Sequence, residues 1–282
     1  MSNLVLRALT GSVIVAAIIL SIIFGKFYFG LLFFIFTVLG TYEFFKMIEK
    51  SEIIAQKAFG TAVAAVLYLL LWWVSYEPFQ PEVAFNPADP QRAMYLIIIV
   101  LLMFVIPIRE LYRTDSDQPI PNIATTLLGI VYIAIPFGLM NFMFRYKGED
   151  TFHLLLGLFV ILWTADTFAY LVGSRIGKNR LFERISPKKS WEGSVGGLIA
   201  SLIAAAVFAY FFKEMSLALW LGYAIVIVVA GAYGDLVESM FKRSLNIKDS
   251  GSILPGHGGI LDRFDAVFIS VPAAILYLMF IS

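Results

Sequence analysis

The chain has 282 residues, of which 60% are hydrophobic, 16% are aromatic and only 15% are charged. This composition excludes an ordinary soluble domain and is typical of a polytopic membrane protein. The formal net charge of +1 identifies no partner, because the charges are segregated along the chain. The absence of cysteine excludes disulfides, zinc–thiolate sites and thiol nucleophiles.

Apolar runs long enough to cross a bilayer as helices recur through the sequence. We predict nine membrane-spanning helices at residues 5–24, 28–46, 58–75, 93–109, 121–143, 151–175, 192–212, 216–242 and 265–281. The first run resembles a signal peptide, but no small-x-small cleavage site closes it and a second span follows, so we expect it to be retained. The expected fold is an all-α polytopic membrane protein.

The positive charges predict how these helices are oriented. If successive connections alternate sides, all but five of the 21 Lys and Arg residues fall on the side of the N-terminus. The five on the other side are Lys26, Arg92, Arg145, Lys147 and Lys213. Because cytoplasmic connections are enriched in Lys and Arg, we expect an N-in, C-out protein of the plasma membrane with a polar cavity open to the cytoplasm.

Ionisable residues divide the sequence into regions. The first five predicted helices carry almost no ionisable groups to bury, and we expect a three-helix scaffold at 1–75 and a two-helix middle region at 76–150. Intramembrane charge usually marks function, so scaffolding or oligomer contact is the favoured role there. A catalytic region of four helices is expected at 151–282, with a signature loop at 239–265.

Acidic residues lie inside two of the last four predicted helices. Asp166 lies in the sixth, and Asp235 and Glu238 lie in the eighth. Inserting each of them costs about 2.5–3.5 kcal/mol, which demands a compensating cation, a proton or a water-filled cavity. Ser239 and Lys242 continue the helical spacing of the two acids in the eighth helix, so all four should form one polar stripe.

A basic segment precedes the seventh predicted helix. In S-P-K-K-S-W-E-G, residues 186–193, Ser186 and Pro187 suit the N-cap and first turn of that helix. A helix N-terminus beside Lys188 and Lys189 would bind phosphate, and the alternative is that these lysines anchor the chain to anionic headgroups. Three nearby glycines suit close packing between helices: Gly193, Gly196 and Gly197.

The stretch at 239–265 combines cations, glycines and carboxylates between two apolar runs. The glycines of its P-G-H-G-G segment would let backbone N–H groups approach an anion, and its Lys and Arg side chains would supply charge for phosphate. Asp262 and Asp265 lie three residues apart and share a face if that turn is helical. Hard carboxylate oxygens beside phosphate indicate Mg²⁺ as the metal.

This stretch resembles the signature of the phosphatidate cytidylyltransferases, or CDP-diacylglycerol synthases: S-x-hydrophobic-K-R, four residues, K-D-x-small, then P-x-H-G-G-hydrophobic-x-D-R-hydrophobic-D. The matching positions are Ser239, Lys242, Arg243, Lys248, Asp249, Gly251, Leu254, Pro255, His257, Gly258, Gly259, Asp262, Arg263 and Asp265. The S-P-K-K-S-W-E-G segment is also similar to a nucleotide-binding element of that family. The resemblance implies condensation of CTP with phosphatidic acid to give CDP-diacylglycerol and pyrophosphate, a step of phospholipid biosynthesis, with a divalent metal.

A metal site is expected from the residues and the resemblance together. Asp235 and Asp262 are the preferred pair for Mg²⁺, and the presence of a second cation is left open. Further candidate ligands are Asp166, Glu238 and Asp265. The alternative for Asp235 is an interhelical ion pair with Lys242 or Arg263, because intramembrane acids often pair with bases.

The remaining site residues follow from the same reasoning. Catalytic roles are assigned to Asp235, Asp262, Lys242 and Arg263. Substrate binding is assigned to Lys188, Lys189, Ser239, Arg243, Lys248, His257, Gly258 and Gly259. The chemical role of His257 is left open, because a histidine in a loop is more often structural than catalytic.

The expected partners are CTP, phosphatidic acid and the lipid bilayer, with a homodimer and no nucleic acid. Phosphatidic acid carries a phosphate monoester that is largely ionised at neutral pH, so the reaction needs positioning and charge neutralisation more than a strong base. One alternative is another membrane nucleotidyl- or phosphotransferase acting on a different lipid phosphate. The other is a cation-coupled transporter that uses the intramembrane acids.

Overall fold

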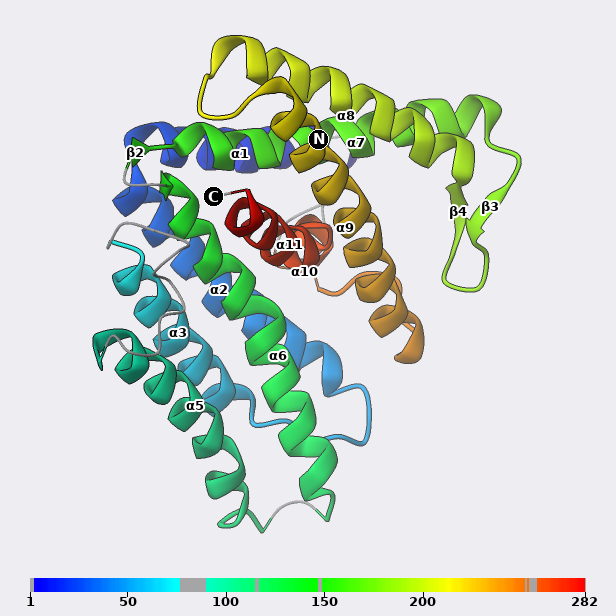
Figure 1. Ribbon diagram of the computed structural model, residues 1–282. Helices are drawn as coiled ribbons and strands as arrows, with labels where there is room; N and C mark the ends of the chain where they lie inside the picture. Colours follow the sequence, from blue (N-terminus) through cyan, green and yellow to red (C-terminus); the bar gives the residue numbers. More distant parts are fainter. Residues whose placement is uncertain are drawn as a thin grey trace. The chain divides into compact units, whose positions relative to one another are not determined.

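The computed structural model describes residues 3–76, 90–114, 117–146, 149–251, 253 and 258–281. Helices form nearly all of it (Figure 1). They are α1 (Asn3–Phe24), α2 (Lys26–Ile48), α3 (Lys57–Val74), α5 (Pro90–Glu110), α6 (Pro119–Met140), α7 (Phe152–Ile176), α8 (Trp191–Phe211), α9 (Leu217–Ser244), α10 (Leu261–Phe264) and α11 (Val267–Phe280). The other elements are a 3₁₀ turn, η1 (Asn141–Phe144), and strands β1 (Arg145–Tyr146), β2 (Glu149–Asp150), β3 (Arg180–Phe182) and β4 (Ser186–Ser190).

The prediction of an all-α polytopic membrane protein is confirmed. Every predicted apolar run coincides with a helix. The run at 265–281 corresponds to α11, and the short helix α10 lies just before it. Among the described residues, eight helices are long and apolar enough to cross a membrane, and α1 adds a shorter apolar segment, Leu9–Phe24. The crossing of all nine and the N-in orientation stay predictions.

The chain divides into two compact units, and the first consists of Met1–Glu149 and Asp249–Arg263. Helices α2, α3 and α6 form its centre, with α1 against α2 and α5 against α6. The three central helices approach closely where glycines face aromatic rings. A Cβ atom at Gly60 would lie 2.8 Å from Phe45, and one at Gly129 would lie 2.7 Å from Phe44.

Buried polar side chains join the helix ends in this first unit. Gln56 donates to Glu110 over 2.6 Å and Asn122 donates to the same carboxylate over 2.8 Å. Arg113 completes the group with an ion pair to Glu110 at 3.1 Å. Since burying a carboxylate is costly without partners, these bonds explain how Glu110 is tolerated at the end of α5.

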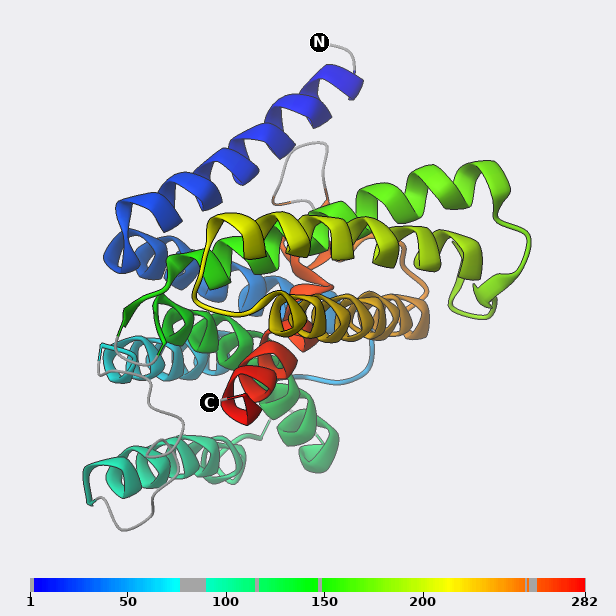
Figure 2. The same cartoon turned by 45° about the horizontal axis from the view of Figure 1, so that its top comes forward.

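The second unit consists of Asp150–Lys248 and Phe264–Ser282. Within it α7 and α8 run side by side over their lengths, α9 packs against both, and α11 packs against α9 (Figure 2). Side-chain hydroxyls tie these helices to one another: Ser201 donates to the Ile161 carbonyl over 3.0 Å, and Tyr223 donates to the Leu154 carbonyl over 3.0 Å. The unit that contains three of the intramembrane acids is therefore a four-helix assembly.

The start of α8 differs from our expectation. Residues Ser186–Ser190 do not begin a helix but form β4, which pairs antiparallel with β3. The helix begins at Trp191, and Ser190 is its N-cap, accepting a hydrogen bond from the Gly193 N–H at 3.1 Å. Ser190 is favoured as the N-cap because a helix that begins at Trp191 has the acidic Glu192 in its first turn, where the helix dipole favours negative charge.

Candidate active site

A polar pocket of about 640 Å³ lies in the second unit, between α7, α8, α9 and the β3–β4 hairpin. Its charged and hydroxyl-bearing lining residues are Asp166, Tyr170, Ser174, Arg180, Lys188, Lys189, Ser190, Ser194 and Asp235. Two predicted carboxylates and two predicted lysines are thus brought into one pocket. Lys188 and Lys189 lie on strand β4 of the hairpin, rather than in the first turn of a helix.

Glycines shape the wall of this pocket. A Cβ atom at Gly197 would lie 2.6 Å from the Ala165 carbonyl oxygen, and one at Gly193 would lie 2.7 Å from the Ala169 carbonyl oxygen. A Cβ atom at Gly196 would lie 2.6 Å from Val172. The prediction that these glycines permit close helix packing is confirmed, because α8 approaches α7 more closely than any side chain would allow.

Asp235 forms an ion pair with Lys189. The two side chains retain 28% and 29% of their exposure, so the pair is partly open to the pocket. Asp166 is close enough to interact electrostatically with both members. The sequence predicts Lys242 or Arg263 as the alternative partner of Asp235, and within the second unit the structure pairs Asp235 with Lys189. The hairpin brings Lys189 next to α9, although this lysine lies 46 positions before Asp235 in the chain. Helical spacing predicts contacts only between residues close in sequence, so it does not predict this ion pair.

The predicted polar stripe on α9 is confirmed. Ser239 donates to Asp235 over 3.2 Å, and Lys242 pairs with Glu238 one turn further on. Glu238 is only 2% exposed, so the lysine offsets the cost of a buried carboxylate. On the segment after α10, Asp265 interacts electrostatically with the acids of α7 and α9.

The metal site stays a prediction. Among the residues described, no three acidic or histidine side chains are grouped so that they could hold a metal ion. The pocket holds one cation against its acids, because the Lys189 ammonium pairs with Asp235 and interacts electrostatically with Asp166. Its hard carboxylate oxygens are the donors that Mg²⁺ prefers, so the residues present fit this ion.

Residues 249–263 of the signature loop belong to the first unit, and Asp262 organises them. Its Oδ2 atom accepts hydrogen bonds from the Ser250 N–H at 3.0 Å and the Gly259 N–H at 2.9 Å, and it lies 2.9 Å from the Ser250 Oγ atom. Gly258 has a φ of +85°, and a Cβ atom there would lie 2.7 Å from the same oxygen. The loop therefore needs glycine at 258 to seat the carboxylate. His257 lies outside the described residues.

Glu43 in α2 is a residue that the sequence analysis missed. Its carboxylate is 2% exposed and accepts hydrogen bonds from Ser250, Ile260 and Leu261. The expectation that the first five helices bury almost no ionisable group is therefore wrong. The available signal was a single acid within the aromatic run of T-Y-E-F-F, inside a predicted membrane-spanning helix.

The other predicted basic residues lie on exposed surfaces. Arg243 donates to the Ile247 carbonyl over 3.2 Å at the end of α9, and Lys248 follows in the connection to the first unit. Arg263 is exposed at the end of the signature loop. Of the predicted cations, only Lys188 and Lys189 line the pocket described above.

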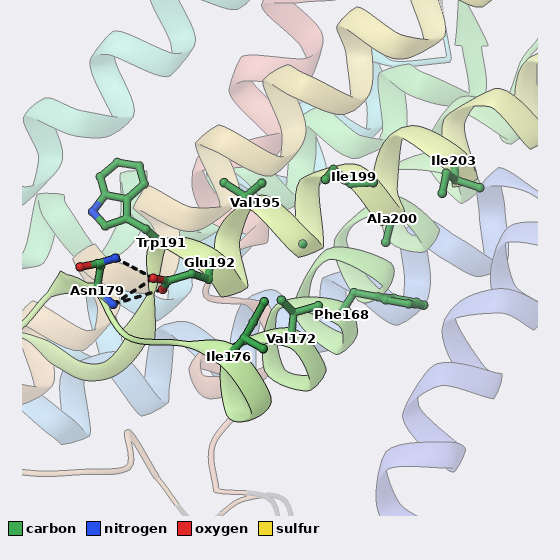
Figure 3. Close-up of a pocket in the computed structure, with 11 residues that line it drawn as sticks. Phe168, Val172, Ile176, Asn179, Trp191, Glu192, Val195, Ile199, Ala200 and Ile203 are labelled. Atoms are coloured by element: carbon green, nitrogen blue, oxygen red, sulfur yellow. Dashed lines mark hydrogen bonds between the residues drawn. The ribbon is translucent and has the colours of Figure 1, made fainter.

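A second, open groove of about 740 Å³ runs along the outside of α7 and α8 (Figure 3). Phe168, Val172 and Ile176 line it from α7, facing apolar residues of α8. At one end Asn179 donates to the Glu192 carboxylate over 2.7 Å. The polar groups of this groove are already paired with one another, so the polar pocket is the candidate site.

Comparisons with known proteins agree with this geometry. The sequence model of the Cytidylyltransferase family matches residues 5–281. A phosphatidate cytidylyltransferase of Staphylococcus saprophyticus is 46% identical over 152 residues, and one of Staphylococcus aureus strain COL is 44% identical over 151 residues. Each of these alignments covers 53% of this chain and 56% of the relative. This chain thus spans only about half the length of those relatives.

A third relative matches over nearly its full length. The phosphatidate cytidylyltransferase of Haemophilus influenzae is 30% identical over 288 aligned positions, which cover 94% of this chain and 95% of the relative. This extent includes the pocket of the second unit as well as the signature loop of the first. The resemblance noted in the sequence is confirmed, and the chain belongs to the cytidylyltransferase family.

Proposed function

We propose that this protein transfers the cytidylyl group of CTP to phosphatidic acid, giving CDP-diacylglycerol and pyrophosphate for phospholipid biosynthesis. The observation that carries the proposal is the pocket in which Asp166 and Asp235 face Lys188 and Lys189. Carboxylates and lysines together in a membrane-embedded helical unit suit a phosphate-rich substrate. Membership of the cytidylyltransferase family supports the same reaction.

In the proposed reaction an oxygen of the phosphatidic acid phosphate attacks the α-phosphorus of CTP. The new P–O bond forms as the bond from the α-phosphorus to the bridging oxygen of pyrophosphate breaks. The attacking phosphate is already largely ionised, so positioning and charge neutralisation supply the rate enhancement. Lys188 and Lys189 would bind the triphosphate, and Lys189 can exchange Asp235 for phosphate because their pair is partly open. Further neutralisation is assigned to Lys242, Arg243, Lys248 and Arg263.

We propose Mg²⁺ as the cofactor, held by Asp235 and Asp262. Further ligands would come from Asp166, Glu238 and Asp265, with room for a second cation. The bound ion would neutralise phosphate charge that the lysines alone do not balance. The support for this assignment is the donor chemistry of the pocket, where carboxylate oxygens already accommodate one cation.

The decisive assay supplies purified protein in mixed micelles with radiolabelled CTP, phosphatidic acid and Mg²⁺. We expect labelled CDP-diacylglycerol in the wild type and none above background in Asp235→Ala or Asp262→Ala. Glu183→Gln, an exposed acid on the β3–β4 hairpin, is the matched control and should retain full activity. Product formed by both alanine variants at the wild-type rate would refute the site, and absence of product in the wild type would refute the function.

Two substitutions of the assay separate the alternatives. Polyprenyl phosphate or diacylglycerol in place of phosphatidic acid tests for a related transferase with a different acceptor, and we expect neither to be labelled. Sealed proteoliposomes test for a cation-coupled transporter. Cation flux without consumption of CTP would favour the transporter and contradict the proposal.

The site is proposed to face the cytoplasm from the plasma membrane of a multi-pass protein, which we expect to be a homodimer. The charge asymmetry and the bacterial relatives support this placement. Because the chain has no cysteine, single introduced cysteines can test this orientation. A membrane-impermeant maleimide should label Lys213→Cys in intact spheroplasts but Glu183→Cys only after lysis. The reverse pattern would overturn the orientation.

A further inference from the structure

Glu43 lies in the last third of α2, a largely apolar helix, and is 2% exposed. A carboxylate in that position persists only where hydrogen-bond donors or a cation compensate it. Each of its hydrogen-bond donors comes from the signature loop, more than 200 residues away. The Ser250 hydroxyl donates to Oε1 at 2.5 Å, the Leu261 N–H donates to Oε1 at 3.1 Å and the Ile260 N–H donates to Oε2 at 2.9 Å.

The glycines of the loop are shaped around this carboxylate. A Cβ atom at Gly251 would have its three nearest contacts with Glu43 alone, the closest at 2.7 Å to Cδ. One at Gly259 would overlap Glu43 Oε1 and the Ser250 hydroxyl. Two glycines of the signature therefore make room for an acid on a distant helix, a requirement separate from any approach of phosphate.

The contact with Glu43 extends to Asp262 through one hydroxyl group. Ser250 Oγ lies 2.5 Å from Glu43 Oε1 and 2.9 Å from Asp262 Oδ2. Asp262 Oδ2 also accepts the Ser250 and Gly259 N–H groups, so the loop backbone lies between the two carboxylates. A change at Glu43 would therefore alter the orientation of Asp262 even though the two acids lie on different helices.

We propose that Glu43 is a positioning residue for the transfer reaction: its carboxylate anchors the signature loop to α2 and thereby fixes the orientation of Asp262. This inference rests on the proposed function, in which Asp262 holds the metal. A purely structural acid would affect only the amount of folded protein. A positioning acid also changes what the folded protein binds, because the loop is displaced while the helices remain packed.

The first test measures the loop without metal or substrate. Ile260 is 1% exposed, and its N–H donates to Glu43, so a cysteine introduced there should be protected from N-ethylmaleimide while the loop is anchored. In detergent, we expect Glu43→Gln to raise the labelling rate of Ile260→Cys at least tenfold. Glu49→Gln, on the residue that caps the same helix and pairs with Lys57, is the matched control and should leave the rate unchanged. Equal labelling rates in all three backgrounds would overturn the anchoring.

The second test measures turnover in the folded fraction. We expect Glu43→Gln to lower kcat/KM for CTP about 30–100-fold and to raise the Mg²⁺ concentration for half-maximal activity several-fold, with partial rescue in Glu43→Asp. A fall in activity that matches the loss of folded protein, at an unchanged Mg²⁺ requirement, would show a structural role only. The proposed function is tested separately by the wild type, which must be active whichever result Glu43 gives.

The third test asks whether Glu43 and the loop act on one another directly. Gly251→Ala should lower activity, because its methyl group would meet the Glu43 side chain. Shortening the acid in Glu43→Asp makes room for that methyl group, so Gly251→Ala should cost at least fivefold less in the Glu43→Asp background than in the wild type. Independent effects, which multiply in the double variant, would contradict the contact and overturn the proposal.

Discussion

Glu43 in α2 and Asp235 in α9 are both carboxylates within apolar helices, yet their surroundings differ. Glu43 is 2% exposed and accepts two backbone N–H groups and one hydroxyl from the signature loop. The Asp235 side chain retains 28% exposure and pairs with one long side chain, that of Lys189. The first carboxylate is fixed by backbone, and the second is held by a group that can move away.

This difference suits Glu43 to anchoring the loop and Asp235 to exchanging partners during a reaction. Backbone donors cannot leave without unfolding the loop, so Glu43 cannot exchange its partners during a reaction. The Lys189 ammonium can exchange Asp235 for a phosphate oxygen at small cost, because the pair is partly solvated. We therefore assign the first unit the task of holding the signature loop, and the pocket of the second unit the task of binding phosphate.

The largest effect is expected for Asp235→Asn. The amide keeps the shape of the side chain but removes the charge that balances Lys189 and would bind Mg²⁺. Loss of one such electrostatic group from a catalytic site lowers turnover about 10³-fold, or ~4 kcal/mol. Steady-state formation of CDP-diacylglycerol, normalised to monodisperse protein, measures this. Turnover within tenfold of the wild type would place the chemistry elsewhere.

A smaller effect is expected for Lys189→Ala. A charge-assisted hydrogen bond to the triphosphate contributes about 1.5–3 kcal/mol, so kcat/KM for CTP should fall roughly 10–100-fold. The same change removes the cation that competes for Asp235, so less Mg²⁺ should suffice for half-maximal activity. Lys178→Ala, an exposed lysine before the same hairpin, is the control. An increased Mg²⁺ requirement in Lys189→Ala would contradict the exchange of partners.

Glycine substitutions compare the packing of the two regions. Gly197→Ala would place a Cβ atom 2.6 Å from the Ala165 backbone, and this overpacking should cost about 1–3 kcal/mol and lower the thermal stability of the detergent-solubilised protein. Gly40→Ala on α2 would place one at an ordinary 3.4 Å from Ile260. It should be tolerated, or slightly stabilising through helix propensity. Equal destabilisation by both substitutions would contradict the expectation that Gly197 is more tightly packed than Gly40.

The smallest effect is expected for Glu49→Gln. Glu49 pairs with Lys57 near the surface, and both side chains are substantially exposed. Surface ion pairs contribute little, because water screens them and ordering the side chains is costly. Activity should change less than twofold, and so should the labelling rate of the signature loop. A large effect here would mean that any acid on α2 matters, and the distinction drawn for Glu43 would be lost.

Local patterns predicted the parts of the fold that depend on local physics. Hydropathy located every long helix, and helical spacing predicted the stripe that joins Asp235 to Ser239 and Glu238 to Lys242. The N-cap of α8 was placed four residues early, because Ser186 and Pro187 have the composition of a cap and first turn, whereas the Gly193 N–H bonds to Ser190 in the structure. Contacts between residues far apart in the chain could not be predicted from these local patterns.

Glu43 with the signature loop and Lys189 with Asp235 illustrate why those pairings were missed. The first joins positions more than 200 residues apart, and the second depends on a hairpin that turns the lysine back toward α9. A single acid such as Glu43 hardly changes the mean hydropathy of a long apolar run, so hydropathy does not mark it as important. Only the donors that surround it show that it anchors the loop.

The account is tested most directly by titrating Mg²⁺ into the CTP and phosphatidic acid assay for Asp235→Asn and Glu43→Gln together. If Asp235 performs the chemistry and Glu43 positions the loop, Asp235→Asn stays near background at every Mg²⁺ concentration, while Glu43→Gln regains much of the wild-type rate as Mg²⁺ is raised. Recovery of Asp235→Asn by Mg²⁺, with Glu43→Gln unresponsive, would contradict the division of roles between the two carboxylates.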